Sequence, residues 1–274
     1  MTLNCNGKLI AISSPKVMGI LNVTPDSFFD GGTYNSDEHC ITQVEKMLAD
    51  GATFIDIGAY SSRPDAKNVS VAEELQRIIP VISVLVKQFP GIILSVDTFR
   101  AEVAKQAIEA GAAIINDISA GHLDPKMLQT VADYNVPYIM MHMRGTPQTM
   151  QQQTTYDDLT KDLLIYFSER IQAARSLGIT DIILDPGFGF AKTTDQNFEL
   201  LNKLDHFKIT DLPLLAGISR KSMIYKTLNT SPEHALNGTT ALHMIALEKG
   251  ARILRVHDVK EAVETITLHQ KLHA

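Results

Sequence analysis

Short apolar segments of strand length alternate along the chain with longer segments whose apolar residues recur every three or four positions. The segment Val17–Asn22 is apolar until it ends on an amide, and residues 37–50 carry apolar side chains at helical spacing. The same alternation continues to the C-terminal region. It predicts seven further strands, each followed by a helix, that end near residues 58, 97, 116, 141, 185, 218 and 256.

The predicted strands are apolar throughout, which indicates a sheet buried on both faces and therefore parallel strands. Eight strand and helix units predict a closed (β/α)8 TIM barrel, formed as a single domain by residues 1–274. An open, doubly wound sheet is the alternative, although no Gly-x-Gly-x-x-Gly motif follows the first strand. Asn6-Gly7 lies between two short apolar runs and predicts an N-terminal β-hairpin before the barrel.

Composition narrows the class of protein. The chain has 274 residues, 45% of them hydrophobic, which suits a soluble globular protein with a large core. A net charge of −6 argues against nucleic-acid or anionic-membrane partners, so any anionic ligand must meet a local cluster of basic residues. Cys5 and Cys40 lack metal-ligand spacing. With no signal peptide and no apolar run of the ~18 residues that span a bilayer, we expect a cytoplasmic protein.

Polar side chains stand at the predicted end of nearly every strand, or in the loop directly after it. They are Asn22, Ser62, Arg63, Asp97, Asn116, His142, Asp185, Lys221, Arg255 and His257. In a parallel barrel these strand ends meet at one mouth, where active sites are assembled from several strands. A single aspartate such as Asp97 could equally be a helix N-cap. So many polar strand ends cannot all be caps.

The charges of these residues indicate two kinds of ligand group. The basic residues suit a phosphate or pyrophosphate: Arg63, Lys221, Arg255 and His257. The acceptor-rich residues suit a flat ring that displays several N–H donors: Asp97, Asn116 and Asp185. The sequence therefore predicts a ligand that combines a nitrogen heterocycle with a phosphate-type group.

Several longer motifs, taken in order, closely resemble the dihydropteroate synthase family of folate biosynthesis. They are Gly19–Phe28, Ser95–Thr98, Asn116-Asp117, Met141–Pro147, Asp185–Phe190, Ser219–Ser222 and Arg255–Asp258. The resemblance extends from about Val17 to the C-terminus. It implies a pterin-binding TIM barrel, a cytoplasmic homodimer that is a sulfonamide target, and small-molecule substrates with no nucleic-acid or membrane partner.

The resemblance also implies a transferase reaction. The family joins 6-hydroxymethyl-7,8-dihydropterin diphosphate to p-aminobenzoate, and releases 7,8-dihydropteroate and pyrophosphate with Mg²⁺ as cofactor. The reaction is dissociative, since pyrophosphate leaves first and the arylamine then attacks a pterin-methyl cation. Stabilisation of charge, rather than a serine or cysteine nucleophile, would be the main contribution of the protein.

By this resemblance, individual residues acquire expected roles. Pterin would be bound by Asp97, Asn116, Asp185, Lys221 and Arg255. The diphosphate would be bound by Asn22, Ser62, Arg63, Arg255 and His257, and Asn22 would also be a Mg²⁺ ligand. The p-aminobenzoate site would comprise Phe28, Arg63, Pro64, Phe190, Lys221 and Ser222. Catalysis would rest on Asp97, Asp185, Lys221, Arg255 and His257.

Two loops depart from the family pattern. Where the family usually has Glu-Ser-Thr-Arg-Pro-Gly, residues 60–65 read Tyr-Ser-Ser-Arg-Pro-Asp, and Ala191 replaces a glycine in a Phe-Gly-Phe-Gly-Lys motif. A pterin-binding methyltransferase and a non-catalytic pterin-binding paralogue remain as alternative functions. Ser219-Arg220-Lys221 and Arg255-Val256-His257 favour diphosphate chemistry over the methyltransferase. The presence of Arg63, Lys221 and His257 argues against the non-catalytic paralogue.

The remaining histidines carry simpler predictions. His142, with Met141 and Met143, is expected to fill the barrel interior. A further group is expected at the surface or in satisfied polar contacts, with no metal-ligand spacing among its members: His122, His206, His234, His243 and His269. Asp117 and Asp258 are expected as caps or as supporting partners of the site.

Overall fold

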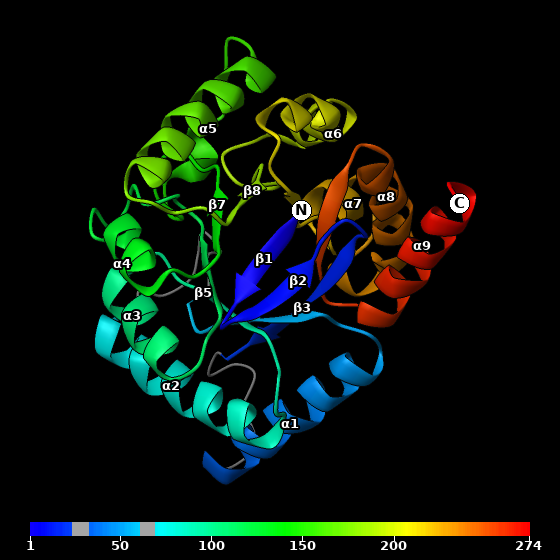
Figure 1. The fold of residues 1–274 in the computed structure, drawn as a ribbon. Helices are drawn as coiled ribbons and strands as arrows, with labels where there is room; N and C mark the ends of the chain where they lie inside the picture. The colour runs from blue at the N-terminus through cyan, green and yellow to red at the C-terminus, as the bar shows by residue number, and fades with distance from the viewer. Residues whose placement is uncertain (24–32, 61–68) are drawn as a thin grey trace.

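The computed structural model describes residues 1–23, 33–60 and 69–274, which form a closed parallel barrel ringed by helices (Figure 1). The barrel order is β10-β3-β4-β5-β6-β7-β8-β9, and β10 also pairs with β9. The strands are β3 (Lys16–Asn22), β4 (Phe54–Gly58), β5 (Leu94–Asp97), β6 (Ile114–Asp117), β7 (Tyr138–Met141), β8 (Ile182–Asp185), β9 (Leu214–Ala216) and β10 (Ala251–Val256). The predicted TIM barrel is confirmed, and the open sheet is wrong.

Helices connect successive strands on the outside of the barrel. They are α1 (Thr33–Ala49), α2 (Val71–Gln88), α3 (Ala101–Glu109), α4 (Met127–Tyr134), α5 (Leu159–Ser176), α6 (Thr194–Asn202), α7 (Ser222–Thr227), α8 (Leu236–Glu248) and α9 (Val259–Leu272). Short 3-10 turns cover Met150–Gln152, Leu204–Thr210 and Pro232–His234. Helix α6 begins at Thr194, because Thr193 and Gln196 form a capping box in front of its first turn.

The predicted N-terminal hairpin is present and closes one end of the barrel (Figure 1). Strands β1 (Thr2–Cys5) and β2 (Lys8–Ala11) are antiparallel, and Asn6 and Gly7 both have positive φ, as a tight hairpin turn requires. The hairpin buries an apolar face against the lower interior of the barrel. The residues of this cluster include Leu3, Cys5, Ile10, Ile12, Met18, Phe54 and Ile253.

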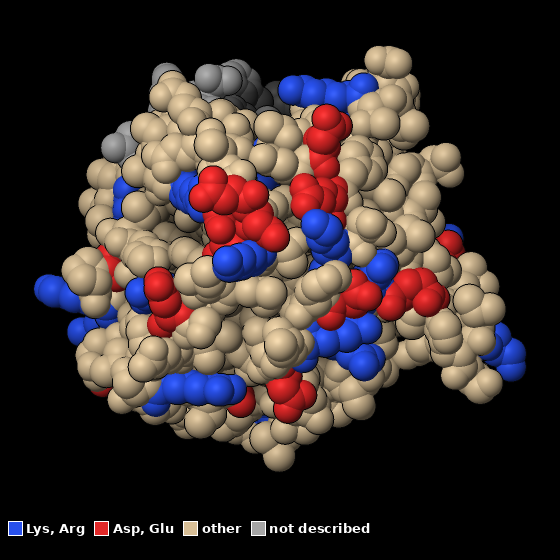
Figure 2. All heavy atoms as spheres, turned by 90° about the horizontal axis from the view of Figure 1, so that it is seen from above, with Lys and Arg blue, Asp and Glu red and all other residues tan. Residues whose placement is uncertain are grey.

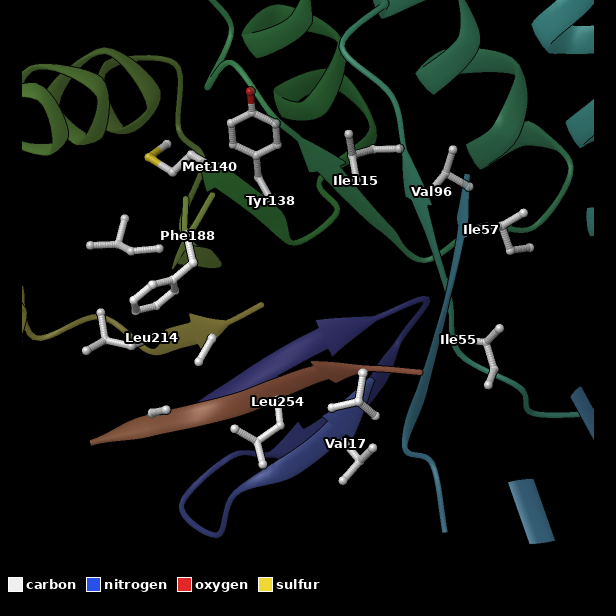
Figure 3. Packing of buried hydrophobic residues seen from close by; sticks show 14 of the residues in the cluster. Val17, Ile55, Ile57, Val96, Ile115, Tyr138, Met140, Phe188, Leu214 and Leu254 are labelled. Carbon is white, nitrogen blue, oxygen red and sulfur yellow. The ribbon is translucent and has the colours of Figure 1, made fainter. Parts of the chain in front are cut away.

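Alternate side chains of each strand point outward and pack against the helices, as Ile55, Ile57 and Val96 do in Figure 3. Gly19 on β3 also faces this layer. A Cβ added there would lie 2.8 Å from the Met47 sulfur and 3.2 Å from Val259, so glycine allows α1 and α9 to approach the strand. The residues between these outward positions, Asp56 among them, face the barrel interior.

The surface carries charges of both signs. Figure 2 shows one face, on which acidic and basic side chains lie interspersed. The net charge of −6 agrees with this mixture. Among the described residues, no helix is both long enough and apolar enough to cross a bilayer.

Candidate active site

Four side chains from β10, β4, β5 and β6 meet inside the mouth of the barrel. Arg255 on β10 donates from Nε to Oδ2 of Asp56 at 2.6 Å, and from Nη2 to Oδ2 of Asp97 at 2.8 Å. Asn116 on β6 donates from Nδ2 to the same Asp56 oxygen at 3.0 Å. The structure thus brings together three residues that the sequence predicted as neighbours, and adds Asp56 on β4 to them.

Asp56 has no place in the residue set predicted from the sequence. It is fully buried, and its Oδ1 has no hydrogen-bond partner among the described residues. A buried carboxylate is costly unless it is paired. An aspartate within the otherwise apolar Thr53–Gly58 segment was therefore the signal that could have identified it.

The pKa values of both Asp97 and Arg255 are raised within this network. Burial raises the pKa of Asp97 to about 7, although the Arg255 guanidinium acts in the opposite direction. Burial also acts to lower the pKa of Arg255, but Asp56 and Asp97 outweigh it and raise that pKa above its usual value. Arg255 is therefore a permanent cation between two carboxylates, one of which can exchange a proton near neutral pH.

Asp185 and Lys221 lie on the other side of the mouth, at the ends of β8 and β9. Asp185 accepts on Oδ1 from the Gly187 amide at 2.8 Å, and Lys221 donates to the Phe188 carbonyl. The Lys221 Nζ also lies 4.9 Å from the centre of the Phe190 ring. Burial raises the pKa of Asp185, and it lowers the pKa of Lys221 to about 8.

The loop after β8 is shaped by a glycine and a buried lysine. Gly187 has φ +72, and a Cβ there would lie 2.1 Å from the His142 carbonyl oxygen, so only glycine fits. Lys192 is buried and donates from Nζ to the carbonyls of Gly187 and Phe190, both at 3.0 Å. Its Nζ also lies 3.0 Å from Nδ1 of His142. Lys192 thus fixes the loop that presents Phe190.

His142 does not fill the barrel interior, so that prediction is wrong. It is buried, but its ring packs against α5, with centroid distances of 4.8 Å to Tyr166 and 6.5 Å to Phe167. The physical reason is strand alternation, since His142 continues the outward face of Tyr138 and Met140. Burial and the Lys192 ammonium lower the pKa of His142 well below its ordinary value.

His257 and Ser219 join the ends of β10 and β9. Ser219 Oγ lies 3.1 Å from Nδ1 of His257 and accepts from the His257 amide at 3.2 Å. Next to them, Arg220 binds both carboxylate oxygens of Asp258, at 2.8 and 2.7 Å. Asp258 therefore holds Arg220, which lies between Ser219 and Lys221 in the chain, and its role in supporting the site stays a prediction.

Asp117 and His243 are both buried, but only Asp117 has the hydrogen-bond partners that were predicted for it. Asp117 accepts from the amides of Ser119 and Gly121, both at 2.7 Å, so it caps the loop after β6 as predicted. His243 on α8 is 2% exposed, and its Nε2 has no partner among the described residues. The prediction that His243 is exposed or satisfied is wrong, because it occupies the buried face of its helix.

The remaining predicted residues divide between the described and undescribed parts of the chain. Asn22 ends β3 with an exposed side chain, and Ser222 is the first residue of α7. The predictions for Phe28, Ser62, Arg63 and Pro64 lie outside the described residues. Their roles stay predictions.

Comparison with known proteins agrees with this arrangement. A family model described as pterin binding enzyme matches residues 18–257. The chain is 46% identical to dihydropteroate synthase of Escherichia coli K12 over 268 residues, 97% of this chain and 94% of that protein. It is 49% identical to dihydropteroate synthase of Synechocystis over 247 residues, 89% and 85% of the two chains.

Solved structures give the same result over the whole chain. Yersinia pestis dihydropteroate synthase with a sulfonamide drug complex has a TM-score of 0.93 and 43% identity, and covers 100% of this chain and 99% of that one. Xanthomonas albilineans dihydropteroate synthase with 4-aminobenzoic acid has a TM-score of 0.93 and 42% identity, with coverage of 100% and 98%. The present chain therefore belongs to the dihydropteroate synthase family of pterin-binding enzymes.

Proposed function

We propose that this chain condenses 6-hydroxymethyl-7,8-dihydropterin diphosphate with p-aminobenzoate to give 7,8-dihydropteroate and pyrophosphate. The observation that carries the proposal is Arg255, held by Asp56 and Asp97 at the bottom of a mouth that also contains Asn116 and Asp185. This combination of a planar cation and hydrogen-bond acceptors suits a flat, nitrogen-rich ring. The close relatives that bear the name of this enzyme support the same conclusion.

The pterin would lie among the acceptors and face Arg255. Asp185 uses Oδ1 for the Gly187 amide, so its Oδ2 can accept an N–H from the ring. Asp97 and Asn116 would accept or donate at the amino-pyrimidinone edge, and Lys221 would contact another polar edge. A ring that lacked these groups would leave buried polar atoms unpaired, which gives the site its selectivity.

The diphosphate would lie above the pterin, near Arg255, His257 and Asn22. Asn22 fits a Mg²⁺ ligand, because its exposed amide makes no side-chain hydrogen bond within the described residues and offers a neutral hard oxygen. When bound, Mg²⁺ would neutralise charge on the departing pyrophosphate. The basic side chains Arg255 and Arg63 would bind the remaining phosphate charge.

Departure of pyrophosphate before C–N bond formation would leave positive charge on the pterin methyl group. Asp97 and Asp185 are placed to stabilise such a cation when they are ionised. The pKa of Asp97, about 7, lies close to the pH at which the enzyme would work. The protein contribution would therefore be a fixed charge pattern, with no covalent intermediate.

The arylamine would enter beside the loop after β8. Phe190 is half-buried and its ring lies close to Lys221, and Ser222 follows directly in sequence. An aromatic ring could pack on Phe190 while its carboxylate reaches the Ser222 hydroxyl and the Lys221 ammonium. Phe28, Arg63 and Pro64 would complete this pocket.

Pyrophosphate release tests the proposed reaction and separates it from the two alternatives. The purified chain should release pyrophosphate and form dihydropteroate when both substrates and Mg²⁺ are present, and a chelator should slow both. A methyltransferase would release no pyrophosphate, and a non-catalytic paralogue would bind the pterin diphosphate without turnover. Asn22→Ala should raise the Mg²⁺ concentration needed for half-maximal rate, and an unchanged Mg²⁺ dependence would contradict the ligand role.

We also propose that the protein is a cytoplasmic homodimer. Leu268 and Leu272 on α9 are 65% and 71% exposed, and Ile245 on the adjacent α8 is 43% exposed, which supports an interface on these late helices. Light scattering of the purified protein tests the dimer. Leu268→Lys should convert it to monomers, whereas Leu177→Lys, on an exposed apolar residue after α5, should not.

A further inference from the structure

Three potential metal ligands meet at the C-terminal ends of α8 and α9. Glu248 is the last residue of α8, His269 lies in the last turn of α9, and His273 follows that helix directly. One ligand atom from each side chain can be chosen so that all three lie within 4.8 Å of one another. Figure 1 shows the two helices side by side, with the C-terminus at the end of α9.

This cluster is distinct from the proposed active site. Helices of a parallel barrel run opposite to its strands, so their C-terminal ends lie at the far end of the barrel from the mouth. No residue of the cluster contacts the Arg255 network. The sequence analysis does not predict this cluster, because it does not consider His273 as a ligand beside His269. The two histidines are four residues apart and lie on one helical face.

The distances already approach those of a metal site. Nε2 of His273 lies 2.7 Å and Nε2 of His269 lies 3.5 Å from the same Glu248 oxygen. Tetrahedral Zn²⁺ with bonds of about 2.0–2.1 Å places its ligand atoms ~3.3 Å apart. The ligand atoms, now within 4.8 Å of one another, would reach that spacing through rotation of the side chains. Two imidazoles and one carboxylate are also the ligand types that zinc accepts, and two histidines at this helical spacing present both rings on one face.

The charges around the cluster are of both signs. Each helix C-terminus carries partial negative charge from its unpaired carbonyls, and two such termini meet here with the Glu248 carboxylate. The positive charges of Lys208 and Arg252 oppose the binding of a cation, because Lys208 interacts electrostatically with Glu248 and Arg252 with His269. Nδ1 of His269 has no acceptor among the described residues, so that ring lacks the orienting hydrogen bond of a fully built zinc site.

We propose that Glu248, His269 and His273 bind one Zn²⁺ per chain, with the remaining coordination position open to water. The ion would link the ends of α8 and α9. Because it would bind the folded chain, it would also stabilise the fold, and this stabilisation would rise with the logarithm of the zinc concentration once that exceeds the Kd. A simple surface pairing of glutamate with histidine would give neither saturable zinc binding nor this stabilisation.

Calorimetric titration of the full chain with Zn²⁺ tests the site, without substrates present. Glu248→Gln, His269→Gln and His273→Gln should each weaken the zinc affinity roughly tenfold or more. His206→Gln is the matched control, because His206 also lies beside a carboxylate, 3.6 Å from Asp205, at the surface. This control should bind Zn²⁺ like the unmodified chain. Circular dichroism of each variant verifies that it is folded.

Substitution with Co²⁺ gives a second, independent measurement. A four-coordinate ion in the proposed site should show the strong visible absorption typical of tetrahedral cobalt, and His269→Gln should abolish it. The proposal is overturned if no saturable binding occurs, if the three variants bind like the unmodified chain, or if His206→Gln weakens binding equally. These outcomes are independent of pyrophosphate release, so the proposed function stands or falls separately.

Discussion

Arg255 and Asp56 form a buried ion pair in the barrel, with Nε of the guanidinium 2.6 Å from Oδ2 of the carboxylate. The partners lie 199 positions apart in the chain, and they join β10 to β4 across β3. Asp97 binds the other side of the same guanidinium at 2.8 Å. Asp56 and Asp97 together therefore fix the orientation of the Arg255 guanidinium.

Replacement of Asp56 by asparagine should weaken both folding and ligand binding. The change removes one of two carboxylates from a buried cation, and breaking such a pair costs roughly 3 kcal/mol of unfolding free energy. Pterin affinity should fall as Arg255 loses its support. Urea denaturation and calorimetry measure the two effects. Asp50→Asn is the control, since its i,i+4 pair with the exposed Lys46 lies on the surface of α1 and should change neither measurement appreciably.

Lys221→Ala should sharply weaken pterin binding. The change removes the cation beside Asp185 and also the donor to the Phe188 carbonyl, so the loop after β8 loses a contact as well. Loss of a charged hydrogen bond of this kind corresponds to roughly 10- to 100-fold in affinity. Lys226→Ala, on the exposed face of α7, should leave affinity unchanged. Equal pterin affinity in the Lys221 variant and the unmodified chain would refute the assigned role.

The barrel could be predicted from sequence because each of its signals is local. A buried parallel strand such as Ile55–Ile57 must be apolar on both faces apart from functional positions. In the helix that follows, apolar residues recur every three or four positions. Strand ends such as Asp97 and Asp185 then converge by topology alone. The sequence pattern therefore identified most of the described polar residues of the mouth.

The parts that escaped prediction depend on orientation and on distant pairing. Asp56 lies within an apolar strand, and only its contacts with Arg255 and Asn116 show why a charge is tolerated there. The outward direction of the His142 side chain depends on the register of β7, because a one-residue shift of that strand would turn the side chain inward. The role of Lys192 depends on partners that only the folded chain brings together, namely two carbonyls of the loop after β8 and the His142 ring that follows β7.

Ala191→Gly should stabilise the protein. Ala191 is buried with φ +49, a left-handed conformation that costs a non-glycine residue about 1–2 kcal/mol. Glycine loses part of this gain through its greater freedom in the unfolded chain. Loss of the buried Ala191 methyl removes about another 0.8 kcal/mol, so the expected net increase in unfolding free energy, measured by urea denaturation, is under about 1 kcal/mol. Ala173→Gly within α5 should have the opposite effect, because glycine destabilises helices.

His243→Leu should reduce the acid sensitivity of folding. Burial lowers the pKa of His243 to about 4, so below its ordinary value of 6.5 the unfolded chain holds a proton that the folded chain lacks. Unfolding is therefore favoured increasingly as pH falls from 6.5 toward 4, by up to roughly 3 kcal/mol for this residue. Leucine removes the titration and adds no buried polar atom.

The matched comparison for His243 uses His234→Leu, on an exposed residue of a 3-10 turn. The unfolding free energies of the unmodified chain, His243→Leu and His234→Leu are measured from pH 8 to pH 4. Their comparison separates the contribution of His243 from that of the buried carboxylates. Asp97 acts in the reverse sense, since its raised pKa makes the folded state bind a proton more tightly as pH falls through 7. The unmodified chain and His234→Leu should lose stability in parallel below pH 6.5, while His243→Leu should lose less. Parallel curves for all three would mean that His243 is protonated in the folded state.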